Sequence, residues 1–367
     1  MARYTLTMLN ICFYAFLLAT CHRASGYLTP SSSSRQPVST TPIFVVTPSK
    51  TETKSTIVAR HGLSARSARI MTPISVIITT LLGPRVALAA KPSGDAFGSS
   101  LQKFFPGALQ SSVIALRVLA ALRKRNYRQY NMILGTSLCS DEINTTPESL
   151  VTSLANVLVD TKSGGVFQLG GLGGIPFVGT SGFNTFVSHC PENGRLLILF
   201  GPHVGISQNG NVGIVEHIGQ IKATPSCAAV TDAVNAANKQ KKDASNSMDF
   251  QQEYVNNKLR ARLEGITNED LVNNGDRSIA DVTNQMYDVI YELLRSQIDA
   301  ATVKEGFWTR ISEITLLGGI VINRGHGSGT LGGQDYFQPL VLKTLKAQGE
   351  DDLYAEVFGD LTTPRRK

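Results

Sequence analysis

Three side chains of the types that bind zinc stand next to predicted strands and helices in the middle of the chain. Cys139 and His203 each follow an apolar stretch, and Cys227 precedes a helical one. A helix start favours the thiolate form of a cysteine, because the backbone dipole lowers the pKa of the thiol. Two cysteines and a histidine that leave one position to water form a known kind of catalytic zinc site. The residue types therefore allow a Zn2+ centre made by Cys139, His203 and Cys227.

The spacing of these three residues leaves a second interpretation open. They lie far apart in the sequence and form no Cys-x-x-Cys pair. Cys139 and Cys227 can equally be small buried apolar residues, with His203 a core histidine that has a hydrogen-bond partner. Spacing alone does not decide between a metal site and an ordinary core.

The elements around the candidate ligands indicate an α/β fold in a single domain. Continuous apolar runs predict strands over 130–138, 195–201 and 314–323. The other predicted elements are helices over 99–126, 148–159, 228–238, 251–263 and 279–294, and a glycine-rich loop over 164–182. Strand ends and helix starts meet at the carboxyl edge of an α/β sheet, so the three candidate ligands can converge there.

Five sequence motifs carry a resemblance to a known family. They are Cys139–Asn144, Leu169–Gly179, Gly201–Ser207, Ser226–Cys227 and Leu317–Asn323. In this order they resemble the limiting-CO2-inducible protein B/C family of theta-type carbonic anhydrases, over roughly residues 105–345. The resemblance implies a beta-carbonic-anhydrase-like sheet flanked by helices, a homodimer, and zinc held by Cys139, His203 and Cys227.

The same resemblance implies roles for several other residues. Asp141 corresponds to an aspartate that pairs with an arginine in beta-type enzymes and orients the zinc-bound water or replaces it. Ile143 stands where that arginine would be, so an arginine from elsewhere must complete the pair. Arg195 and Arg324 are the candidates. His189 and His326 are candidates for lining the pocket or transferring protons, although His189 is equally interpreted as a surface turn histidine.

The expected activity is the interconversion of CO2 and bicarbonate in support of photosynthetic carbon concentration. Zinc lowers the pKa of bound water to roughly 7, and the resulting hydroxide can attack CO2. The alternative is a catalytically silent, zinc-stabilised family member that binds partners in a carbon-concentrating assembly. A zinc hydrolase is a third interpretation. The absence of a Gly-x-Ser-x-Gly motif excludes an α/β-hydrolase serine elbow.

The positive charge of the chain is concentrated at its amino-terminal end. The formal net charge is +7, and residues 1–90 contain nine Lys or Arg but only one acidic residue, Glu52. The rest of the chain is therefore nearly neutral. A basic protein can bind nucleic acid, but here the excess charge lies in a presequence, so no nucleic-acid partner is expected.

The first ninety residues have the composition of a targeting sequence in several parts. Residues 1–24 are predicted to be a signal peptide and 25–70 a plastid transit peptide, with Ala24–Pro30 resembling the junction motif of algae with secondary plastids. Residues 71–90 predict a thylakoid-lumen signal. The mature protein is expected in the plastid, in the thylakoid lumen or alternatively in the stroma. It is predicted to comprise a zinc domain over 91–349 and a polar tail over 350–367, without a membrane span.

Overall fold

The computed structural model describes residues 96–159, 165–217, 219–238, 249–263, 275–325 and 335–361. All of these residues lie in the larger of two compact units, 84–367. The predicted targeting segments and His326 lie outside the described residues. Among the described helices, none is long and apolar enough to cross a membrane.

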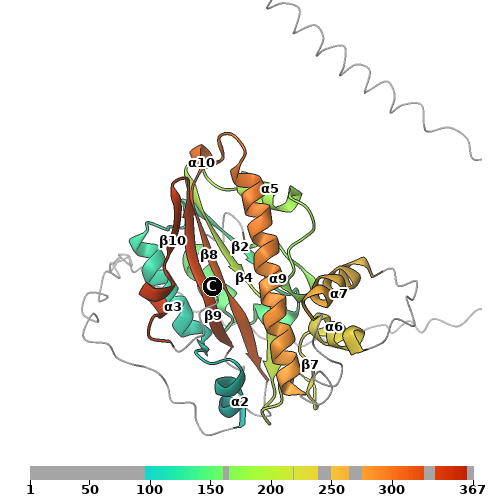
Figure 1. Ribbon diagram of the computed structural model, residues 1–367. Helices are drawn as coiled ribbons and strands as arrows, with labels where there is room; N and C mark the ends of the chain where they lie inside the picture. Colours follow the sequence, from blue (N-terminus) through green and yellow to red (C-terminus); the bar gives the residue numbers. More distant parts are fainter. Residues whose placement is uncertain are drawn as a thin grey trace, which may run out of the picture. The chain divides into compact units, whose positions relative to one another are not determined.

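An eight-stranded mixed sheet forms the centre of the domain (Figure 1). Its main path runs in the order β1-β9-β8-β4-β2-β3, while β5 pairs with β8 and β10 with β9. The strands are β1 (Leu109–Gln110), β2 (Met132–Ser137), β3 (Phe167–Gln168), β4 (Gly194–Phe200), β5 (His203–Ile206), β8 (Ile311–Arg324), β9 (Tyr336–Lys346) and β10 (Gly349–Asp352). Strands β2, β3, β4, β5 and β8 run parallel, and β9 is antiparallel to β8. The predicted α/β fold is confirmed.

Long strand β8 has two partners along one edge. Its first part, 311–318, pairs with β4, and its last part, 321–324, pairs with β5. Strands β4 and β5 are thus two consecutive pieces laid along the same neighbour. The link between them is Gly201-Pro202, and the Val321 amide donates to the Pro202 carbonyl at 3.0 Å.

The apolar sequence of β4 is explained by burial on both of its faces. Leu196, Ile198 and Phe200 pack with α9 (Asp276–Thr302), and Leu197 and Leu199 pack on the other side with α3 (Ser111–Lys124) and α4 (Leu150–Leu158). The α9 face of the sheet is also covered by α5 (Ser181–Ser188), α6 (Ala228–Asn238), α7 (Phe250–Leu263) and α10 (Phe307–Arg310). The α3 face also receives α11 (Tyr354–Phe358). Figure 1 shows α9 and α3 on either side of the strands.

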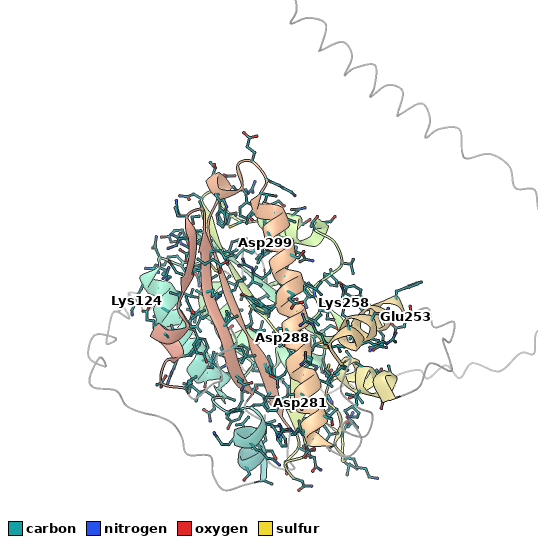
Figure 2. The ribbon with its side chains drawn as sticks, viewed as in Figure 1. Lys124, Glu253, Lys258, Asp281, Asp288 and Asp299 are labelled. Atoms are coloured by element: carbon teal, nitrogen blue, oxygen red, sulfur yellow. The ribbon has the colours of Figure 1, made fainter. Side chains whose placement is uncertain are left out.

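Helix α9 is amphipathic, as its sequence predicts. Val282, Met286 and Ile290 are buried in the core. Asp281, Asp288 and Asp299 are labelled in Figure 2, and Asp281 and Asp299 pair with arginines one turn away on the same helix. The helix therefore separates the sheet from a charged outer surface.

Two sequence-based expectations about individual segments are wrong, and one strand was missed. The helix predicted over 99–126 is two helices, α2 (Ala96–Phe104) and α3, because Pro106 and Gly107, with a φ of 80°, turn the chain between them. Strand β9 was not predicted. Residues 350–361 do not form a loose polar tail: they form β10 and α11, where Leu353, Tyr354 and Phe358 are buried against the sheet.

Candidate metal centre

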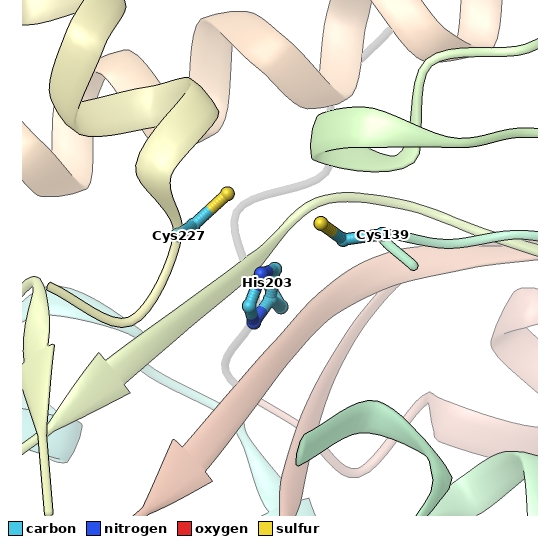
Figure 3. Close-up of side chains that lie close together, drawn as sticks. All are labelled: Cys139, His203 and Cys227. Atoms are coloured by element: carbon cyan, nitrogen blue, oxygen red, sulfur yellow. The ribbon is translucent and has the colours of Figure 1, made fainter. Parts of the chain in front are cut away.

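Three elements deliver the candidate ligands to one point (Figure 3). Cys139 lies two residues after β2, His203 begins β5, and Cys227 immediately precedes α6. One ligand atom from each lies within 4.8 Å of the others. All three residues are buried, with exposed fractions of 6%, 1% and 3%. The convergence expected at the carboxyl edge of the sheet is therefore confirmed.

His203 is placed by the close approach of β4 and β5 to β8. Gly201 has a φ of 148°, and a Cβ atom at this position would lie 1.7 Å from the Gly319 carbonyl oxygen. Only glycine allows the chain to pass this point and resume pairing with β8 at His203. The position of the histidine is therefore fixed by a backbone contact.

The imidazole of His203 has one partnered and one unpartnered nitrogen. Its Nδ1 lies 2.8 Å from the Asn323 side-chain oxygen, which can only accept, so Nδ1 carries the proton. Nε2 is buried and has no hydrogen-bond partner among the described residues. Although burial opposes the shift, Cys139 raises the pKa of this imidazole. Once Nε2 has given up a proton, it and the two sulfurs would each offer a lone pair to a zinc ion.

The two sulfur atoms share a strongly polar setting. The hydrogen bond from the Cys227 thiol, with further help from His203, lowers the pKa of Cys139 to about 4, although burial opposes this shift. The negative charge on Cys139 in turn raises the pKa of Cys227. The Gly173 amide donates to the Cys139 sulfur at 3.2 Å, and the amides of Ala229 and Val230 in α6 favour the Cys227 thiolate. A metal ion would complete a site already polarised toward negative sulfur.

Asp141 flanks the cluster on its more open side. Its Oδ2 lies 3.9 Å from Nε2 of His203, and 19% of its side chain is exposed, against 1% for His203. Its Oδ1 accepts the Ile143 amide at 3.3 Å, which begins the short helix η1 (Glu142–Thr145). Burial raises the pKa of the Asp141 carboxyl. Asp141 therefore lies beside His203 with its carboxyl partly open to solvent.

The other predicted site residues within the described ranges pack against aromatic rings. Arg195 is the second residue of β4, roughly 17 Å before the strand ends, and lies over the ring of Tyr127. His189 is exposed after α5, with its ring edge against Phe167. Arg324 lies over Phe97 at the end of β8. Neither arginine forms an ion pair with Asp141 among the described residues.

Sequence reasoning missed two kinds of neighbour. Asn323 lies 120 residues from His203, and its only local signal was its place at the end of an apolar strand. His217, which the sequence suggests is an ordinary surface histidine, bonds to Glu142 at 3.1 Å beside Asp141. Both contacts join distant parts of the chain, so no local pattern predicts them.

Comparisons with known proteins agree with this geometry. A protein-family model described as limiting CO2-inducible proteins B/C beta carbonic anhydrases matches residues 108–346. The crystal structure of PtLCIB4, a homolog of the limiting CO2-inducible protein LCIB, is similar at 28% identity and a TM-score of 0.56, covering 69% of this chain and 98% of that one. The structure of LCIB itself is similar in fold, at 20% identity and a TM-score of 0.50, covering 69% and 97%. No curated protein matches the sequence.

Proposed function

Because this chain belongs to the limiting CO2-inducible protein B/C family of beta-carbonic-anhydrase-like proteins, we propose that it interconverts CO2 and bicarbonate with a zinc ion. The ligands would be Cys139, His203 and Cys227. The observation that carries the proposal is the buried group of two sulfurs and one unpartnered imidazole nitrogen. It supplies three ligands and leaves one position open, the arrangement of catalytic zinc sites.

When bound, zinc supplies Lewis acidity that makes water nucleophilic near neutral pH. The residues of this chain would hold the ion and orient the reactants. The two sulfurs and the imidazole fix the position of the reaction, and the Gly173 amide holds the Cys139 sulfur in place. The carboxylate of Asp141 lies 3.9 Å from His203, where it would accept a hydrogen bond from the reacting water and orient it.

Stopped-flow hydration of CO2 by the purified protein, together with zinc analysis, tests the proposal. We expect a chelator-sensitive rate, its loss in Cys139→Ser together with the zinc, and its loss in Asp141→Asn with the zinc retained. His189→Ala is the matched control, since that histidine is exposed and its ring packs against Phe167. A zinc-loaded protein with no rate above background would refute catalysis.

A catalytically silent, zinc-stabilised partner-binding protein is the second candidate, and one observation favours it. The described charged groups that act on Asp141 are His203 and Glu142, whereas an arginine pairs with this aspartate in the beta-type pattern. This candidate predicts bound zinc without hydration, and capture of partners that is lost after substitution of surface residues. Measured hydration would exclude it.

We further propose that the protein works as a homodimer in the plastid, in the thylakoid lumen rather than the stroma. The support is the family resemblance and the composition of residues 1–90, with their basic, Ser- and Thr-rich sequence and the Ala87-Leu88-Ala89 cleavage pattern. Light scattering of the purified protein tests the dimer. Immunogold labelling of sectioned cells tests the compartment, and gold in the stroma or outside the plastid would refute the lumen location.

A further inference from the structure

A chain of buried polar groups continues behind His203. The Asn323 side-chain oxygen accepts from Nδ1 of His203, and the Asn323 amide nitrogen donates to Oδ1 of Asp335 at 3.3 Å. Asn323 and Asp335 have exposed fractions of 0% and 3%. Three polar residues thus lie in line inside the protein, beginning at the candidate metal ligand.

Backbone pairing sets the first step of this chain. His203 opposes Val321, and Asn323 opposes Gly205, so His203 and Asn323 lie on one face of neighbouring strands, diagonally across the pair. Asp335 comes just before β9, where Tyr336 opposes Ile322, and its carbonyl accepts the Ser111 amide at 2.8 Å. All three residues are therefore held by the sheet or by α3.

Burial of the Asp335 carboxyl in this position costs free energy of folding. Among the described residues it forms no ion pair, its Oδ2 has no hydrogen-bond partner, and burial raises its pKa to about 7, with some help from the Glu148 charge. Burying a carboxyl with so few partners destabilises a fold. Among the groups that favour its ionised form, the Asn323 amide acts most strongly, ahead of His203 and Thr146, so the role of Asp335 is to be sought at Asn323.

Resting on the metal site of the proposed function, we propose that Asp335 is a positioning residue that acts through Asn323. An asparagine side chain can rotate to exchange its oxygen and nitrogen with little change of shape. In its ionised form Asp335 can only accept, so it selects the amide nitrogen of Asn323 and turns the oxygen toward His203. That oxygen holds the proton on Nδ1 and leaves Nε2 free to bind the metal. In the rotated form, the nitrogen would face Nδ1 and the proton would move to Nε2, the tautomer that cannot bind there.

The test is zinc affinity, measured by competition with a chromophoric chelator. Loss of a partner behind a metal-binding histidine lowers affinity about 10- to 100-fold, and we expect this for Asp335→Leu. Asp335→Asn retains an oxygen that accepts from Asn323, so its affinity should stay within about threefold of wild type. Tyr127→Phe is the matched control: it removes a buried hydrogen bond to Thr315, away from the site, and should not change the affinity.

A double-variant cycle separates positioning from general stability. In Asn323→Asp, both side-chain oxygens accept, so His203 keeps its partner whichever way the side chain turns. Asp335→Leu should therefore have no further effect on zinc affinity in that background. An equal loss in both backgrounds, or a wild-type affinity for the single variant Asp335→Leu, would overturn the proposal.

The tautomer of the unsubstituted protein provides a measurement that does not require Asp335→Leu to fold. Nitrogen-15 NMR of the metal-free protein should show a proton on Nδ1 of His203, and an Nδ1 that carries no proton would overturn the proposal. None of these readouts depends on turnover. A protein that binds zinc but hydrates no CO2 would refute the enzymatic function. The positioning role of Asp335 would still be decided by the zinc affinities and the NMR measurement.

Discussion

Replacing Asp335 by asparagine should change how the stability of the metal-free protein depends on pH. The carboxyl has a pKa of about 7 in the folded protein and about 3.9 in an unfolded chain. Between these values the folded state keeps a proton that the unfolded state has lost. The free energy of unfolding therefore falls as pH rises, by about 1.4 kcal/mol per pH unit and by about 4 kcal/mol in all. Above pH 7 this contribution no longer changes.

Urea unfolding of the wild type and Asp335→Asn across this pH range measures the effect. Asparagine cannot titrate, so the variant should gain stability relative to wild type from about pH 4 to about pH 7, and the difference should then stay constant. Asp351→Asn is the matched control. That exposed carboxyl pairs with Lys346 and Arg125, which lower its pKa, so its change with pH has the opposite sign. A difference between wild type and Asp335→Asn that does not vary with pH would show that Asp335 is ionised throughout, and would refute the argument from burial.

Three other substitutions test the site and the fold. Gly201→Ala should lower stability by about 3 kcal/mol, because its Cβ would collide with the Gly319 carbonyl. Gly182→Ala has open space around it and should be neutral. Thermal unfolding compares the two variants, and equal melting temperatures would contradict the close contact. Phe358→Ala should cost about 3–5 kcal/mol in chemical unfolding, since the ring is fully buried. No loss would mean that α11 does not pack on the sheet. Cys139→Ser should reduce bound zinc from about one ion per chain to near zero by metal analysis, while retained zinc would exclude this thiol as a ligand.

The parts of the fold that could be predicted are those that local pattern determines. The runs 132–134 and 196–200 are continuously apolar because both faces of their strands are buried, and the structure forms strands there. The ligands Cys139 and His203 could be placed because each follows such a run. Helix α6 was predicted directly after Cys227 and lies there.

The parts that could not be predicted depend on pairing between distant segments. Strand β9 is antiparallel in a mainly parallel sheet, and its polar residues Gln338, Lys343 and Thr344 interrupt the apolar pattern. Helix α11 follows four exposed residues of β10, so the polar composition hides its few buried side chains. The partner of His203 was not predicted because the register of β5 on β8, which brings Asn323 to it, cannot be read from either strand alone.

The two-residue link between β4 and β5 also determines which side of the sheet the imidazole faces. Side chains alternate along a strand, so one residue inserted beside Gly201-Pro202 would either shift β5 along β8 or turn His203 to the opposite face, away from Asn323. The length of this link is thus a constraint independent of which residues serve as ligands. Transfer of the centre to another scaffold would require the whole β4–β5–β8 unit with its chain length preserved, because copying three ligand side chains would not reproduce the orientation of the histidine.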